Sequence, residues 1–122
     1  MSNIDWSQLI TKAMKDAAAA AATLAAAKAE LASRNTLAAQ QIARIQDRVD
    51  TLGYGVDSGE ATEEDENELA ALTVSLKAWK TYKYALGNVT KQTAWPAAPV
   101  WPTAPAIPDI AADPAALAPD TV

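Results

Sequence analysis

The side chains in this chain that could best act as catalytic groups or metal ligands are the carboxylates between positions 57 and 68. Read as a calcium loop beginning at Asp57, the run places Gly59 and Ala61 at the third and fifth positions, and neither offers a side-chain oxygen. The sixth position would be Thr62, where a calcium loop needs glycine. Read as a catalytic pair, the carboxylates lack the burying surroundings that would separate two pKa values. We therefore interpret the run as the solvated beginning of a helix.

Other catalytic chemistry has little support in the sequence. The 122 residues include no histidine and no cysteine, which removes the usual proton shuttle, disulfides and thiolate metal ligands. A serine nucleophile would lack a histidine partner. The segment GYGVDSG at 53–59 is not followed by the Lys-Ser/Thr of a phosphate-binding loop and does not follow a strand. We expect no enzymatic activity, no catalytic residue, no cofactor and no metal.

Charge and hydropathy also narrow the class of partner. The net charge is −5, and the basic groups of residues 69–93 form only a small patch, which argues against nucleic-acid binding. The longest apolar run, 17–22, is too short to span a bilayer. The first five residues carry no basic segment of a signal peptide. These features favour a protein partner and a chain that is made in the cytosol.

Residues 5–52 predict one long helix, because no glycine or proline interrupts them and strong helix formers dominate. Alanines in its apolar seam would let another helix approach closely, and Asn35 could fix the register. The alternative is a solvated helix with incidental alanines. The seam, in steps of four and three, comprises Ile10, Met14, Ala17, Ala21, Leu24, Lys28, Leu31, Asn35, Ala38, Ile42, Ile45, Val49 and Leu52.

A second helix is predicted at about 62–86. Three glycines between 53 and 59 indicate a loop of about nine residues before it. Thr62 and Asp65 have the spacing of a capping box, and Gly87 is a plausible stop. Because short loops join antiparallel helices, the fold class is all-α, a long antiparallel, coiled-coil-like hairpin over 1–87. The second seam comprises Leu69, Leu72, Leu76, Trp79, Lys83 and Leu86.

The arms of this hairpin are unequal. At ~1.5 Å per residue the first helix is roughly 70 Å long and the second roughly 38 Å, so residues from about 5 to 27 lack a helical partner. A second copy of the chain, a different protein or the chain's own tail could cover them. The apolar side chains that need this cover are Trp6, Leu9, Ile10, Met14 and Leu24.

The tail, 88–108, is predicted to be extended. Prolines recur at every third position from 96 to 108, which matches the three-residue turn of a polyproline II helix. At ~3.1 Å per residue, 96–108 would span roughly 40 Å, enough to return along the uncovered part of the first helix. The alanine, proline and aspartate composition of 109–122 predicts disorder.

Aromatic residues provide the candidates for partner binding, since tryptophan and tyrosine bury large areas with few rotatable bonds. Trp79 could equally belong to the hairpin core, and the surface on which Trp95 and Trp101 dock could be the chain's own helices. The predicted partner-binding residues are Trp6, Met14, Trp79, Lys80, Tyr82, Trp95, Trp101 and Pro102.

Six segments resemble the tail fibre assembly proteins of tailed bacteriophages and prophages. The most specific feature is an acidic turn, then Leu-x-x-Trp-Lys-x-Tyr, a valine and a Trp-Pro pair, here Leu76, Trp79, Lys80, Tyr82, Val89, Trp101 and Pro102. The segments, within residues 4–108, are IDWSQLITKAMKDAAAAAA (4–22), AKAELASR (27–34), IARIQDRVD (42–50), GEATEEDENELAAL (59–72), LKAWKTYKYALGNV (76–89) and VWPTAP (100–105).

The resemblance implies a chaperone that acts in the bacterial cytoplasm on the C-terminal region of a trimeric tail fibre, promoting its folding and trimerisation. Some family members stay attached to the fibre tip of the particle. Two departures matter. Family members often carry a separate N-terminal domain, whose fibre contacts cannot be carried over here. Lys83 stands where arginine is common, and GNVTKQ at 87–92 is less typical.

Three hypotheses therefore stand. The first is a non-enzymatic fibre-assembly chaperone, for which the unpaired half of the first helix and the order of motifs argue. The second is a permanent structural cap on the fibre tip, suggested by the tryptophan- and proline-rich tail. The third is a homo-oligomeric coiled-coil adaptor unrelated to fibres.

Overall fold

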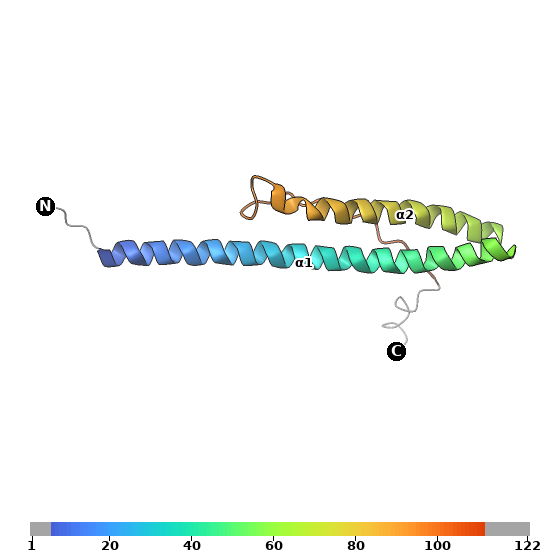
Figure 1. The fold of residues 1–122 in the computed structure, drawn as a ribbon, viewed down its shortest axis with the longest axis horizontal. Coiled ribbons are helices and arrows are strands. Elements are labelled where there is room, and N and C mark those ends of the chain that lie inside the picture. The colour runs from blue at the N-terminus through green and yellow to red at the C-terminus, as the bar shows by residue number, and fades with distance from the viewer. Residues whose placement is uncertain (1–5, 112–122) are drawn as a thin grey trace, which may run out of the picture.

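A computed structural model describes residues 6–111 as a long antiparallel helical hairpin followed by an extended segment. Helix α1 spans Trp6–Ser58 and helix α2 spans Glu63–Gly87, with a single 3₁₀ turn, η1, at Val89–Lys91. Figure 1 shows α2 lying along the C-terminal half of α1, while the N-terminal part of α1 extends beyond it. Residues 6–111 include no strand. The predicted fold class is confirmed.

The connection between the helices is shorter than the sequence suggested. We expected a loop over 53–61, but α1 continues through Gly53 and Gly55 to Ser58. Glycine inside a helix costs about 1 kcal/mol, and here the buried Leu52 and the pairing with α2 offset that cost. Gly59, at φ 78°, supplies the left-handed residue that ends the helix.

The end of α1 is a Schellman motif. The Gly59 amide donates to the Val56 carbonyl at 3.1 Å, and the Glu60 amide donates to the Gly55 carbonyl at 2.9 Å. Only Gly59 among these residues needs the freedom of glycine, because its φ is positive. The chain therefore reverses within a few residues, which sets the two helices side by side.

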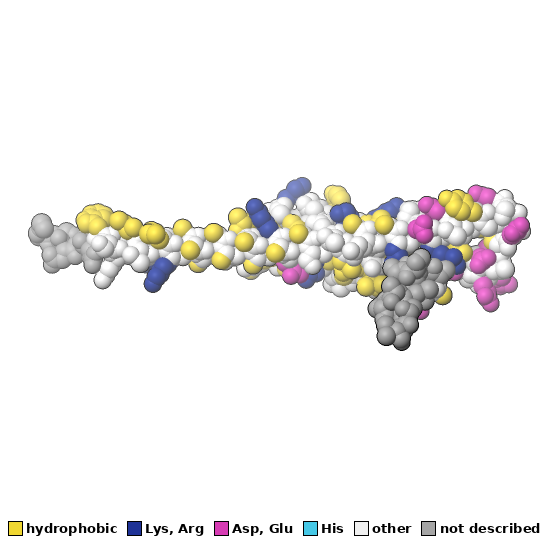
Figure 2. All heavy atoms as spheres, turned by 90° about the horizontal axis from the view of Figure 1, so that it is seen from below, with side chains coloured by type: hydrophobic (Ala, Val, Ile, Leu, Met, Phe, Trp, Pro, Cys, Tyr) yellow, Lys and Arg dark blue, Asp and Glu magenta, His cyan; other side chains and the backbone are white. Residues whose placement is uncertain are grey.

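The start of α2 has the predicted capping box. The Asp65 amide donates to the Thr62 hydroxyl at 3.1 Å, and the Thr62 amide donates to the Asp65 carboxylate at 3.0 Å. Carboxylates fill the first turn, where the helix dipole favours negative charge. Acidic side chains accordingly gather at the hairpin end of the molecule in Figure 2. This arrangement agrees with the interpretation of the acidic run as a helix beginning.

The core lies along the paired half of the hairpin. Tyr82 is buried at this seam, whereas the sequence analysis had placed Lys83 there; Lys83 instead points outward and donates to the Asn35 side-chain carbonyl at 3.2 Å. The reason is shape and charge, because the tyrosine ring fills the space beside Trp79 and the ammonium stays in water. The buried core residues are Ala38, Ile45, Leu52, Leu72, Leu76, Trp79, Tyr82, Leu86 and Ile110.

An ion pair also links the helices. The Arg48 guanidinium donates to both carboxylate oxygens of Glu68, at 2.8 and 3.0 Å, the bidentate geometry that suits these two groups. The hydrogen bond from Arg48 lowers the pKa of Glu68 below its ordinary value. The pair therefore helps to fix the register of α2 against α1.

The extended segment packs on the hairpin as a strap, which we define as residues 99–110. The side chains of Pro99, Pro102, Pro105 and Pro108 are all half-buried, as expected when one edge of a three-residue repeat faces a surface. The strap passes Arg34, Trp79 and Arg44 in turn, and Ile110 reaches the core. It therefore runs along the paired half of α1, toward the hairpin turn.

This path corrects two expectations. The tail was a candidate cover for the unpaired part of α1, but it lies on the other half, because Trp79 and the hairpin groove offer it hydrogen bonds and an apolar surface. Disorder was expected from Asp109 onward, yet Ile110 is only 2% exposed. Residues 112–122, to which the same expectation applied, lie outside the described residues.

Trp79 is the side chain whose loss we expect to cost the fold most. Its ring is fully buried, and its indole N–H donates to the Ala106 carbonyl at 3.2 Å. Trp79→Ala would leave a large cavity at the point where both helices and the strap meet. We expect it to lower the free energy of unfolding by about 3–5 kcal/mol, measured by urea denaturation. Lys80→Ala, at the exposed neighbour, is the control and should change it by less than about 0.5 kcal/mol.

The Arg48–Glu68 pair should make stability depend on pH. A carboxylate whose pKa is lowered by folding stabilises the fold above its unfolded pKa of about 4.3, and this contribution is lost as the pH falls through the lower, folded pKa. Glu68→Gln should therefore cost about 0.5–1 kcal/mol at pH 7, and the difference from the unmodified chain should vanish in strong acid. An equal cost at pH 7 and pH 2 would contradict this assignment.

Candidate partner-binding site

The N-terminal arm, which we define as residues 6–26 of α1, is the largest uncovered element of the hairpin. Every side chain in it is exposed except Leu24, which is half-buried, and Ala27 is the first buried residue of α1. Trp6 is 64% exposed, Ile10 58% and Met14 66%. Apolar side chains follow this slender end of the molecule in Figure 2. The predicted lack of a helical partner for this part of α1 is thus confirmed within residues 6–26.

The arm has two distinct faces. Trp6, Leu9, Ile10 and Met14 recur at the three- and four-residue spacing that places side chains on one face of a helix. This apolar face continues the seam that α2 covers farther along, from Leu31 to Ile45. The arm is therefore an extension of the hairpin interface from which the second helix is missing.

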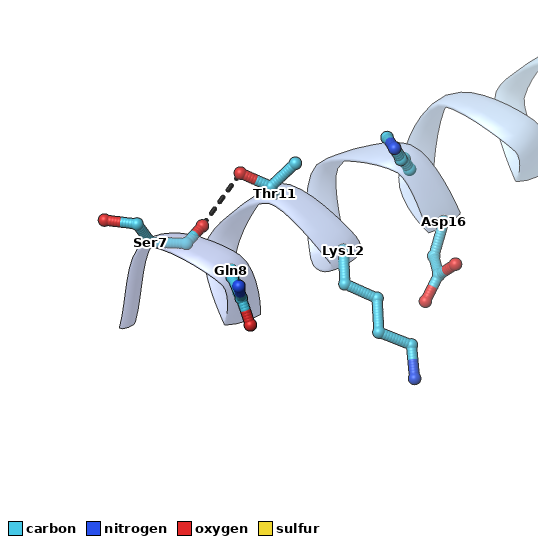
Figure 3. Close-up of a pocket in the computed structure, with 6 residues that line it drawn as sticks. Ser7, Gln8, Thr11, Lys12 and Asp16 are labelled. Atoms are coloured by element: carbon cyan, nitrogen blue, oxygen red, sulfur yellow. Dashed lines mark hydrogen bonds between the residues drawn. The ribbon is translucent and has the colours of Figure 1, made fainter. Parts of the chain in front are cut away.

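The opposite face of the arm is polar. An open groove there runs along a single helix, and Figure 3 shows Lys12 and Asp16 pointing to the same side of it. The Thr11 hydroxyl donates to the Ser7 carbonyl at 2.8 Å, within the helix itself. Within residues 6–111, no other segment lines this groove, whose residues are Ser7, Gln8, Thr11, Lys12, Lys15 and Asp16. A surface of this kind suits solvent better than an enclosed ligand.

Two of the aromatic candidates lie in the core. Trp79 is fully buried and Tyr82 is 4% exposed, and their rings meet edge to face with centroids 5.5 Å apart. The Tyr82 hydroxyl accepts a long hydrogen bond of 3.5 Å from the Arg34 guanidinium. We therefore assign Trp79 and Tyr82 to packing, the alternative that the sequence had left open for Trp79.

The other tail candidates pack on their own chain. Trp95 and Trp101 meet edge to face with centroids 6.2 Å apart, and the Arg34 guanidinium lies 4.8 Å from the centre of the Trp101 ring, where the ring attracts a cation. The hydrogen bond to Tyr82, supported by Glu30, raises the pKa of Arg34 above its ordinary value. Trp95, Trp101 and Pro102 are each half-buried, so part of each remains accessible.

The turn before the strap is closed by one side chain. The side-chain nitrogen of Gln92 donates to the Val100 carbonyl at 2.8 Å, and the side-chain oxygen of Gln92 accepts from the Val100 backbone N–H at 2.7 Å. This pairing brings Trp101 back toward Trp95. Farther along, the Arg44 guanidinium donates to the Pro108 carbonyl at 2.7 Å.

Lys80, the remaining candidate, lies on the outer surface of α2, away from the arm. It borders a shallow apolar and basic area with Thr73, Lys77 and Tyr84, and Tyr84 is 76% exposed. The structure therefore does not gather the predicted residues into one site. It leaves Trp6 and Met14 on the arm, Lys80 on α2, and Trp95, Trp101 and Pro102 at the strap.

Several residues that matter for these surfaces were missed by the sequence analysis. Arg34, Arg44 and Gln92 hold the strap and its turn, but no local pattern distinguishes them from other polar residues. Val100 and Ile107 on the strap remain 73% and 57% exposed. Leu9 and Ile10 belong to the arm's apolar face, and their spacing from Trp6 could have placed them in the predicted site.

No metal site is evident in the described part of the chain. Among residues 6–111, no three or more acidic side chains are grouped so as to hold a metal ion. No described helix contains a stretch that is both long and apolar enough to cross a membrane. Comparison with family models, curated proteins and solved structures finds no match to this chain.

Because the apolar face of the arm contacts nothing else in the hairpin, polar substitutions there should spare the fold. We expect Ile10→Ser combined with Met14→Ser to change the free energy of unfolding by less than about 0.5 kcal/mol. The measurement should be made at high dilution, so that binding to another molecule does not contribute. Ile45→Ser, in the buried seam, is the contrasting variant and should be severely destabilised. A comparable loss in both variants would show that the arm is packed.

Proposed function

We propose that this protein is an assembly chaperone for a phage or phage-like tail fibre, binding the fibre's C-terminal region through the apolar face of its arm. The observation that carries the proposal is that face: Trp6, Leu9, Ile10 and Met14 lie exposed along one side of the helix that continues into the hairpin. An exposed apolar patch of this extent is typical of a surface that binds another protein.

The resemblance to tail fibre assembly proteins supports the nature of the partner. Most of the residues that carry its most specific feature have a clear place in the hairpin. Leu76, Trp79, Tyr82 and Val89 are buried, and Trp101 with Pro102 belongs to the strap. In this proposal the shared pattern builds a rigid hairpin and strap, and their task is to present the arm.

Physical reasoning supplies a role for such an arm. Before the three chains of a fibre tip meet, each exposes strand edges and apolar surface that would otherwise aggregate. The 21 residues of the arm extend for about 32 Å, long enough to cover a strip of such a surface. Its alanines allow a close approach, and its lysines, Lys12 and Lys15, lie on the far face.

The packing of the strap gives less support to a permanent cap than the sequence alone does. The cap was suggested by tryptophans and prolines free to dock on the fibre, but Trp101 packs on Arg34, and Trp95 packs on Trp101. Finding the protein in purified particles by mass spectrometry would favour the permanent cap over the chaperone that is released. The unrelated adaptor would be favoured if the chain associates with itself and does not bind the fibre in pull-downs.

Co-expression with the fibre's C-terminal region tests the chaperone directly. We expect the fibre to be recovered as a soluble trimer with this protein and largely as aggregate without it, measured by the trimer fraction on size-exclusion chromatography. Ile10→Asp combined with Met14→Asp should reduce that fraction at least severalfold, because two charges would have to be desolvated at the contact.

The matched control places two charges on the outer surface of α2. Val74→Asp combined with Tyr84→Asp replaces side chains that are 71% and 76% exposed, and it should leave the yield of fibre trimer unchanged. The proposal fails if the fibre trimerises equally well without the protein. If both double variants act alike, the fibre contact does not lie on the arm.

A further inference from the structure

We propose that, when no fibre is present, the arm is covered by the arm of a second copy of this chain, paired antiparallel about a twofold axis. The inference goes beyond the proposed function and concerns the free protein. Its consequence for the fibre, which would have to replace the second copy, rests on that function.

The direction of pairing follows from the continuity of the seam. Helix α2 runs antiparallel to α1 and ends at Gly87, and burial of α1 begins only at Ala27. Figure 1 shows the apolar end of α1 continuing beyond the end of α2. An antiparallel second arm would continue the line of α2 over the same face, with the same handedness of packing.

The hairpin also excludes the opposite direction. A parallel partner in register would bring its own long α1 along the same face, and beyond the arm it would collide with α2, which already occupies that face of α1. In the antiparallel arrangement the partner's α1 leaves past Trp6, away from α2. Helix α2 is followed by η1 and the turn at 93–97, which Figure 1 shows extending past the end of α2. This segment would stop the partner's arm, which places the partner's Trp6 close to Leu24.

The order of side-chain sizes fits this register. Bulky apolar residues occupy the first turns of the arm and alanines follow over 17–22. With Trp6 near the partner's Leu24, Ile10 lies beside the partner's Ala21 and Met14 beside the partner's Ala17. The twofold axis repeats each contact in the other direction. Large residues thus face alanines in the central layers of the contact, which lets two helices interdigitate at close distance.

The charges of the arm do not oppose this contact. Lys12 and Lys15 lie on the groove face, away from Ile10 and Met14. Asp16, which Figure 3 shows on a common side with Lys12, lies at the margin of the apolar face, two turns from Leu9. Pairing therefore buries no formal charge at the centre of the contact. Three heptads contribute about six layers of side chains from each helix, a length at which paired helices become stable although a single one is marginal.

The mass of the chain alone tests the pairing, with no fibre in the experiment. Light scattering across a range of concentrations should give about twice the monomer mass of 12.8 kDa. Ile10→Asp combined with Met14→Asp should return the chain to the monomer mass. A strong helical signal in circular dichroism should show that the hairpin is still folded. Val74→Asp combined with Tyr84→Asp, on α2, should leave the dimer intact.

Disulfide trapping tests the direction, since the natural chain has no cysteine. A chain carrying Ile10→Cys mixed with one carrying Ala21→Cys should form the mixed disulfide readily on mild oxidation. Ile10→Cys alone should not link to itself, because the two positions lie about 11 residues apart along the pair, roughly 16 Å.

Three outcomes would overturn the inference. They are a monomer mass at the highest concentration, a dimer that survives the arm substitutions, and self-linking of Ile10→Cys, which would indicate a parallel pair. None of these bears on fibre trimer yield, so the inference and the proposed function fail independently. If the chain is a monomer and still increases the yield of fibre trimer, only the inference of a second copy is wrong, and the proposed function stands.

Discussion

The unequal length of the two helices is the constraint from which the rest of this structure follows. A 53-residue helix carries an apolar stripe along most of its length, and a 25-residue helix can cover only part of it. The uncovered remainder is a matter of geometry, because no rearrangement of the hairpin could hide it without unwinding α1. The molecule is thus divided into a packed half that maintains shape and an arm that depends on contact with something else.

The packed half is organised around Trp79. This residue is fully buried between the helices, its ring contacts Tyr82, and its indole N–H reaches the strap at Ala106. One side chain therefore joins three segments that are distant in sequence. The strap adds what an alanine-rich helix pair lacks, namely bulk: Trp101 and Ile110 fill the side of the hairpin where the small Ala38 leaves room. Local repetition of proline keeps the strap extended without needing a sheet.

Sequence reasoning predicted the hairpin because its signals are local and repeated. The apolar spacing of both helices, the capping box at Thr62 and the glycine at the end of α2 each act within a few residues. It misplaced the end of α1 because glycine is only a weak helix breaker when the flanking turns are packed. Whether Tyr82 or Lys83 lies in the buried seam is decided by the space beside Trp79, and the spacing of residues along the sequence gives no information about that space. The exposed arm followed from the helix lengths, but the path of the strap depends on Arg34, Arg44 and Gln92, whose roles exist only in three dimensions.

The position of Ile110 in the core has a consequence for how the protein is made. The residue belongs to the same buried cluster as Ala38 and Leu72, yet the ribosome adds it only after both helices are complete. The arm is synthesised before Ile110, so the cluster that holds the hairpin closed is still incomplete when the arm leaves the ribosome. Translation therefore exposes the apolar arm well before the scaffold that orients it is finished, and a neighbouring chain from the same message would meet the arm in that interval.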